Sequence, residues 1–139
     1  MTQSPYLTAT LVLAGIAIMF LGLNVGLGGM QTLGWQTSAP FIAVTDETVF
    51  HVQDSHIRFI GGVWFSVGAV FFLGGFKQEI LRTTLVVLCA AIAFAGLFRL
   101  SGLSGGVVFS AAIMPSLALE LVAFPLLAGW LLWAGKRAG

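Results

Sequence analysis

Charge is what this sequence has least of. Only 8% of its residues are Asp, Glu, Lys or Arg, whereas 58% are hydrophobic and the mean hydropathy is +1.03. A soluble domain carries about a quarter charged residues, so this chain has too little polar surface to cover a globule in water. The six basic and five acidic residues nearly balance and form no Lys/Arg run, which gives no support to nucleic-acid binding. The composition therefore predicts a protein in lipid, with no nucleic acid among its partners.

Cysteine and the common catalytic motifs are also scarce. The single cysteine, Cys89, lies in an apolar run, so no disulfide framework or CxxC motif can form, and we expect a small packing residue. A GxSxG motif, a P-loop, a GxGxxG that opens a helix after a strand, and paired histidines across spans for haem are all absent. His51 and His56 are five residues apart with Asp54 between them, which is poor helical spacing for a shared metal ion. We expect no catalytic residue, no metal site and no cofactor.

Four long apolar segments follow one another along the chain. The first, at about 6–29, precedes every charged residue and lacks both the basic leader and the cleavage motif of a signal peptide, so we expect a retained helix. The others lie at about 57–76, 83–101 and 113–135. An α-helix needs about 20 apolar residues to cross a bilayer. The sequence therefore predicts one all-α domain, 1–139, folded as an integral membrane antiparallel four-helix bundle.

The basic residues predict the orientation of this bundle. Four crossings place both termini on one side of the membrane, together with the second connection, and that side carries four basic residues against two on the other. Because cytoplasmic segments are enriched in Lys and Arg, we expect cytoplasmic N and C termini and a long exoplasmic connection at 30–56. The four cytoplasmic basic residues are Lys77, Arg82, Lys136 and Arg137.

The connection at 30–56 is expected to contain the start of the second helix. Thr45 is followed by two acidic residues, which predicts a helix N-cap there and an extension outside the membrane. His51, Asp54 and Arg58 recur at spacings of three and four, so they share one face of that extension. The exoplasmic residues that we expect to make contacts are Trp35, His51, Asp54 and His56.

Glycines recur at helical spacing in the first two spans. Helices gain little in lipid from hiding apolar surface, so stripes of small residues let their backbones approach closely. We expect these stripes to pack a compact bundle, with a dimerisation face as the alternative. The two sets are Gly15, Gly22 and Gly29, and Gly61, Gly68 and Gly75.

Four polar residues inside the spans are predicted to lie at one depth. Counted from the cytoplasmic ends at ~1.5 Å per residue, Arg99 and Glu120 reach ~26 and ~24 Å, and Arg58 and Asn24 reach ~28 and ~27 Å. We expect Arg99 to pair with Glu120, because a lone buried charge is far more expensive than a pair. Arg58 is either held by Asp54, one turn earlier, or faces a ligand.

Two interpretations of this polar layer stay open. In the first, Arg99 and Glu120 clasp two helices together while Arg58 reaches the lipid headgroups. In the second, two arginines against one glutamate leave a net positive pocket. That pocket would bind the carboxylate or phosphate of an amphiphile whose tail lies between the helices.

Proline shapes the last span. With Glu120 at that depth, residues 104–112 would project beyond a hydrocarbon core of ~30 Å. Because proline suits the first turn of a helix, Pro115 predicts that the membrane helix begins near Met114. We expect Pro125 to kink the helix below Glu120.

Three short motifs carry a family resemblance: HIRFIGG at 56–62, LFRLSG at 97–102 and ELVAFP at 120–125. With them the chain resembles a family of small bacterial four-helix membrane proteins of unknown function, close in size and layout to the DoxX-like proteins. The resemblance covers most of residues 10–135 but does not extend to 46–56. It implies an integral inner-membrane bundle and adds weight to the charged residues of the polar layer, and it implies no reaction.

The sequence favours a non-enzymatic function, because the chain is small and has no catalytic constellation. We expect an accessory or scaffold subunit that joins a larger membrane complex through its glycine-lined faces and its exoplasmic loop. The alternative is a protein that binds or transports a lipophilic anionic molecule, or a small enzyme acting on one, through Arg58, Arg99 and Glu120. The expected partners are membrane lipids and either another membrane protein or a second copy of the chain, in a bacterial cytoplasmic membrane.

Overall fold

The computed structural model describes residues 4–33, 44–105, 109–110 and 113–138, and all regular secondary structure in these residues is helical. Four stretches are long and apolar enough to cross a membrane, which confirms the predicted number of spans. They are Pro5–Gly28, Glu47–Phe76, Gln78–Gly102 and Met114–Arg137.

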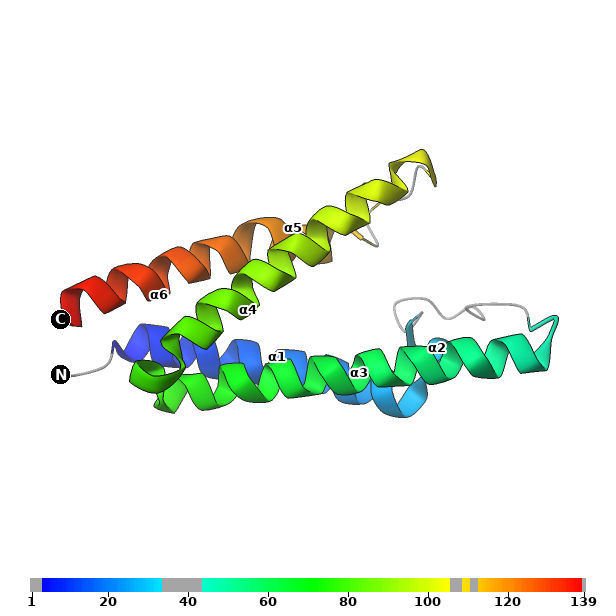
Figure 1. Cartoon of the computed structure of the whole chain (residues 1–139), viewed down its shortest axis with the longest axis horizontal. Coiled ribbons are helices and arrows are strands. Elements are labelled where there is room, and N and C mark those ends of the chain that lie inside the picture. The colour runs from blue at the N-terminus through cyan, green and yellow to red at the C-terminus, as the bar shows by residue number, and fades with distance from the viewer. Residues whose placement is uncertain (1–3, 34–43, 106–108, 111–112, 139) are drawn as a thin grey trace. The chain divides into compact units, whose positions relative to one another are not determined.

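The chain divides into two compact units, and each is a pair of antiparallel helices with its connection (Figure 1). The assembly of the two units into one four-helix bundle stays a prediction. The first hairpin, residues 4–76, contains α1 (Pro5–Gly28), the short α2 (Met30–Leu33) and α3 (Glu47–Phe76). The second hairpin, from Lys77 onward, contains α4 (Gln78–Arg99), the 3₁₀ segment η1 (Leu100–Gly105), α5 (Met114–Ala118), the π-helical segment η2 (Leu119–Ala123) and α6 (Phe124–Ala138).

Glycines bring the backbones of α1 and α3 into direct contact. A Cβ on Gly15 would collide with the backbone of Phe72, and one on Gly22 with the backbone of Phe65. From the other side, a Cβ on Gly68 would lie 2.5 Å from the backbone nitrogen of Met19. The glycine stripes therefore pack this hairpin internally, as the prediction of a compact bundle requires.

The helix α3 is continuous from Glu47 to Phe76, so the extension predicted at its start is part of one 30-residue helix. Its first turn is held by Asp46, whose Oδ1 accepts a hydrogen bond from the Val49 amide at 3.0 Å. The prediction of Thr45 as the N-cap was therefore wrong by one residue, because the carboxylate of Asp46 reaches the free amide. At ~1.5 Å per residue the helix is ~45 Å long, which exceeds the ~30 Å core of a bilayer.

Side chains, rather than backbone contacts, fill the interior of the second hairpin. Its buried apolar residues recur at spacings of three and four on α4, which marks one face of that helix, and the rest lie on α5 and α6. Cys89 is fully buried among them, as expected for a packing residue. The buried set is Leu85, Cys89, Ile92, Leu117, Leu127 and Leu131.

The last span begins at Met114 with Pro115 in its first turn, as predicted. Where Pro125 was expected to kink the helix, the structure has the π-helical segment η2, closed by a hydrogen bond from the Phe124 amide to the carbonyl of Leu119. Pro125 has no amide hydrogen, so it cannot form the usual α-helical hydrogen bond to the carbonyl four residues earlier. A wider turn directly before it is consistent with this missing hydrogen bond.

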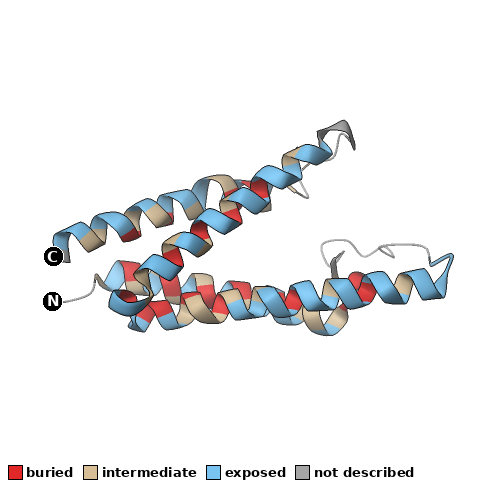
Figure 2. Cartoon of the chain, viewed as in Figure 1, coloured by how far each residue is buried: buried red, intermediate tan, exposed pale blue. Residues whose placement is uncertain are grey.

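Exposed residues follow the helices of both hairpins (Figure 2), and many of them carry large apolar side chains. An exposed surface of this kind suits contact with lipid chains, where burial against protein brings no hydrophobic gain. Examples are Leu13, Phe20, Leu73, Val87, Phe94 and Leu126.

Candidate functional site

The first polar cluster lies where α1 ends. The amide of Gly29 donates to the carbonyl of Val25 at 2.8 Å, and the chain then turns into α2 with Gly29 at a φ of +66°. That backbone conformation favours glycine. A Cβ at this position would also collide with the carboxylate of Asp54. Gly29 is therefore required twice, for the turn and for the approach of α3.

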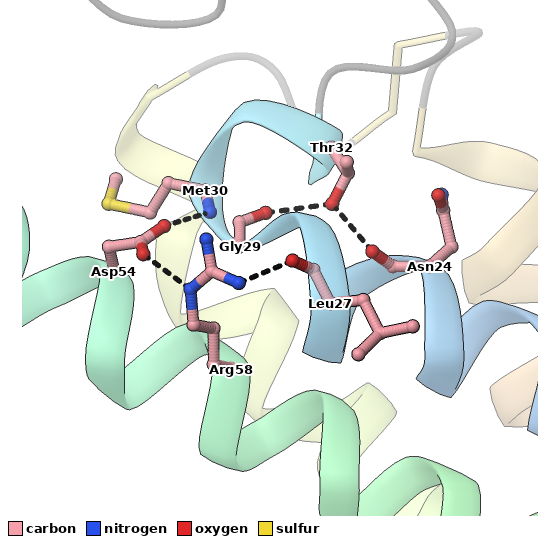
Figure 3. Close-up of polar contacts among 7 residues, drawn as sticks. All are labelled: Asn24, Leu27, Gly29, Met30, Thr32, Asp54 and Arg58. Carbon is pink, nitrogen blue, oxygen red and sulfur yellow. Dashed lines mark hydrogen bonds and ion pairs between the residues drawn. The ribbon is translucent and has the colours of Figure 1, made fainter.

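Asp54 and Arg58, one turn apart on α3, fasten this turn (Figure 3). Oδ1 of Asp54 accepts a hydrogen bond from the Met30 amide at 2.7 Å, and Oδ2 accepts one from Nε of Arg58 at 2.6 Å. Nη1 of Arg58 donates in turn to the carbonyl of Leu27. The carboxylate is buried, whereas the side chain of Arg58 is 44% exposed.

The charges of this pair match the groups that they meet. The last carbonyls of a helix lack partners and carry partial negative charge, so a guanidinium on Leu27 stabilises the end of α1. A carboxylate on the Met30 amide satisfies a donor at the start of the next helix. We call this arrangement the junction clasp, formed by Leu27, Gly29, Met30, Asp54 and Arg58.

Asn24 belongs to the same cluster through its backbone. The hydroxyl of Thr32 donates to the carbonyls of Asn24 at 3.0 Å and of Gly29 at 2.8 Å (Figure 3). The sequence placed Asn24 and Arg58 at one depth, and both lie at this end of the hairpin. The part that Asn24 plays, however, is that of a carbonyl acceptor.

The second polar cluster joins α4 to the π-helical segment. Nε of Arg99 donates to Oε2 and Oε1 of Glu120 at 2.8 and 3.0 Å, which confirms the predicted pair. Glu120 is buried and the side chain of Arg99 is 44% exposed. We call this pair the interhelical clasp. Its terminal guanidinium nitrogens have no bond to another described residue.

Glycine again makes room for the carboxylate. A Cβ on Gly96, one turn before Arg99, would lie 2.8 Å from Cβ of Glu120 and 3.2 Å from its Oε2. Glu120 lies within η2, where the π-helical turn is wider than that of an α-helix. Single π turns are frequent at functional sites, and here the turn coincides with a charged residue inside a span.

Each arginine of the polar layer therefore has its own carboxylate. Arg58 is held by Asp54, which was the first of the two alternatives that the sequence left open. The positive pocket hypothesis counted two arginines against one glutamate, and Asp54 compensates the difference. That both clasps share one layer stays a prediction.

The remaining candidates contribute less to these clusters. His51 and His56 are exposed, and the ring of His51 contacts Phe50 edge-on with centroids 5.7 Å apart. Among the described residues, no three His, Cys, Asp or Glu side chains are placed to hold a metal ion. Trp35 lies outside the described residues.

Sequence reasoning missed the backbone partners of the junction clasp. The signal that could have found them is the Gly28–Gly29 pair, which directly follows the first span and is typical of a helix end. Met30 and Asp54 are 24 residues apart, so no local sequence pattern indicates their contact.

Comparison with known proteins gives a family and no activity. Neither the curated proteins nor the solved structures include a match to the chain. Residues 6–131 match the family described as Domain of unknown function (DUF4345), which confirms the resemblance to small membrane proteins of unknown function. The chain belongs to this family.

Proposed function

We propose that this DUF4345 protein is a non-enzymatic accessory or scaffold subunit of a larger membrane complex. The observation that carries the proposal is the use of the charged side chains inside the spans. Asp54, Arg58, Arg99 and Glu120 all bind the protein's own helices. Residues that hold helix ends and helix pairs together make a stable framework, and many of the exposed residues along the spans are large and apolar.

The proposed setting is a bacterial cytoplasmic membrane with both termini in the cytoplasm. Four crossings place the start of α1, the end of α6 and the turn at Lys77 on one side. Four of the six basic residues lie on that side, as the positive-inside rule requires of a cytoplasmic face. Each clasp then lies near the exoplasmic end of its own hairpin.

The glycine stripes are not available to bind a partner, because they form the contact between α1 and α3. The surfaces that we propose for a partner are therefore the outer apolar sides of the helices and the exoplasmic connection. Membrane helices associate by close van der Waals packing, so a partner has to match the shape of these sides better than lipid chains do. A second copy of this chain is one partner of this kind.

A second function is favoured by one observation, the half-exposed side chains of Arg58 and Arg99. Arg99 binds Glu120 through Nε alone, and its terminal nitrogens have no bond to another described residue. Such a group is able to bind the carboxylate or phosphate of a lipophilic anion by paired hydrogen bonds. The protein would then bind or transport that molecule, or act on it.

Purification in a mild detergent followed by mass spectrometry separates the two functions. A membrane protein retained at fixed stoichiometry supports the accessory role, and a retained amphiphile without a protein partner supports the second function. An isolated chain that retains neither would overturn both. Harsh detergent provides the matched control, because it should strip a specific partner while the covalent mass of the chain stays the same.

A further inference from the structure

The end of the second hairpin opposite the interhelical clasp is strongly basic. Here α4 begins and α6 ends, at the same end of the antiparallel pair (Figure 1). This end has four basic residues and a single acidic one, Glu79. We call the basic set the basic collar: Lys77, Arg82, Lys136 and Arg137.

Arg82 lies flat against α6. A Cβ on Gly135 would be 2.7 Å from Nη1 of Arg82 and 3.1 Å from its Cδ, so the absence of a side chain at 135 gives the guanidinium its place. Arg82 is partly buried as a result. Its charged group is thereby held at the helix–helix boundary, with less rotamer freedom to lose on binding a ligand.

Arg137 is ordered by a different contact. Its Cζ lies 3.8 Å from the centre of the Trp133 ring, a cation–π distance. Trp133 is 51% exposed, and tryptophan prefers the depth of the lipid headgroups. The stacked pair therefore presents a guanidinium where the phosphates of a bilayer lie.

No collar residue forms an ion pair with another described residue. The ion pairs of the described residues join Arg58 to Asp54 and Arg99 to Glu120, and none includes a collar residue. Two of the remaining acidic residues, Asp46 and Glu47, lie at the start of α3, a 30-residue helix away from Phe76. Only Glu79 is left to oppose four positive charges.

We propose that the basic collar binds the headgroups of anionic phospholipids in the leaflet that surrounds it. Guanidinium groups form paired hydrogen bonds with phosphate oxygens, and each basic residue near a membrane surface favours anionic lipid. The ordered pair Arg82 and Arg137 contributes most, and Lys77 and Lys136 add charge. This inference depends on membrane insertion and is independent of the accessory role.

Native mass spectrometry of the full chain in neutral detergent tests the collar. The protein is given equal amounts of phosphatidylglycerol and phosphatidylcholine with the same acyl chains, and the ratio of the two bound lipids is measured. The wild type should retain more phosphatidylglycerol. The double variant Arg82→Gln/Arg137→Gln should lower the ratio, by about fivefold for each guanidinium removed.

Two further variants serve as controls. Arg82→Lys/Arg137→Lys keeps both charges and should keep most of the preference, while Glu47→Gln changes the net charge outside the collar and should leave the ratio unchanged. Unfolding temperatures of all variants show whether each is folded. Equal binding of both lipids by the wild type would overturn the proposal. So would an unchanged ratio in the double glutamine variant, or a shift of similar size in Glu47→Gln.

Discussion

In the first hairpin the backbones of α1 and α3 touch at glycines, whereas in the second hairpin α4 and α6 are packed through leucine, isoleucine and cysteine side chains. The ion pairs differ in the same sense. Asp54 and Arg58 lie on one helix and hold the turn that leaves α1, but Arg99 and Glu120 join two helices. In the first hairpin, where the backbones are in contact, the ion pair stabilises a helix end. In the second hairpin, where side chains separate the backbones, the ion pair connects the two helices.

Removing the cation of the interhelical clasp should have the largest effect on stability. Arg99→Met leaves the buried Glu120 without its partner, and we expect the free energy of unfolding to fall by about 3 kcal/mol, the low end for a broken buried pair because Arg99 is half-exposed. Denaturant unfolding in detergent micelles measures the change.

The matched control removes both charges. Arg99→Met/Glu120→Met replaces the pair with apolar side chains and should recover most of the lost stability, because no charge is then left unpaired in lipid. A double variant as unstable as Arg99→Met would show that the pair is not the clasp described here.

The backbone contact of the first hairpin should give the next largest effect. A Cβ in Gly22→Ala would collide with the backbone of Phe65, so the helices must separate, at a cost of about 2 kcal/mol. Gly62→Ala is the control, because a Cβ there meets nothing within 4 Å. Thermal unfolding of the two variants side by side tests the difference, and equal losses would contradict the glycine contact.

A smaller effect is expected at the glycine of the second hairpin. In Gly96→Ala the new Cβ would lie 2.8 Å from Cβ of Glu120, a less severe overlap than the one with the backbone nitrogen of Phe65 at Gly22, so we expect a loss of about 1.5 kcal/mol. Gly129→Ala, with open space around its Cβ, should change the unfolding free energy much less. A loss at Gly96 greater than that at Gly22 would reverse the contrast between the hairpins.

The junction clasp should give the smallest and most local effect. Asp54→Asn keeps an oxygen for the Met30 amide but removes the charge that binds Arg58, and we expect a smaller loss of stability than in Gly96→Ala because Arg58 is half-exposed. Hydrogen exchange at the Met30 amide should accelerate while the amides in the middle of α1 keep their protection. Faster exchange along the whole of α1 would mean that the pair holds the entire hairpin together.

Much of the helical layout could be predicted from the sequence, because length, apolar composition and proline chemistry act locally. The start of the last span at Met114 followed from Pro115 and from the thickness of a bilayer. The pairing of Arg99 with Glu120 followed from their equal heights on consecutive helices. In each case the decisive quantity was distance along one helix.

The remaining contacts depend on how the helices rotate and how the chain turns back. The junction clasp needs the Gly29 turn to bring Met30 to Asp54, and no periodicity encodes that approach. The π-helical segment arises from hydrogen bonding around Pro125, where a kink was the simpler expectation. Asp46 displaced Thr45 as the cap because both residue types suit the position and only geometry decides between them.

We conclude that the charged residues inside the spans stabilise the protein's own helices, and we propose that the protein functions through a partner. The most direct test compares wild type and Arg99→Met/Glu120→Met after purification in mild detergent, with the retained molecules identified by mass spectrometry. The proposal predicts that the double variant, at near wild-type stability, retains the same membrane-protein partner at the same stoichiometry. A stable double variant that loses an amphiphile held by the wild type would contradict it and identify Arg99 as part of a binding site.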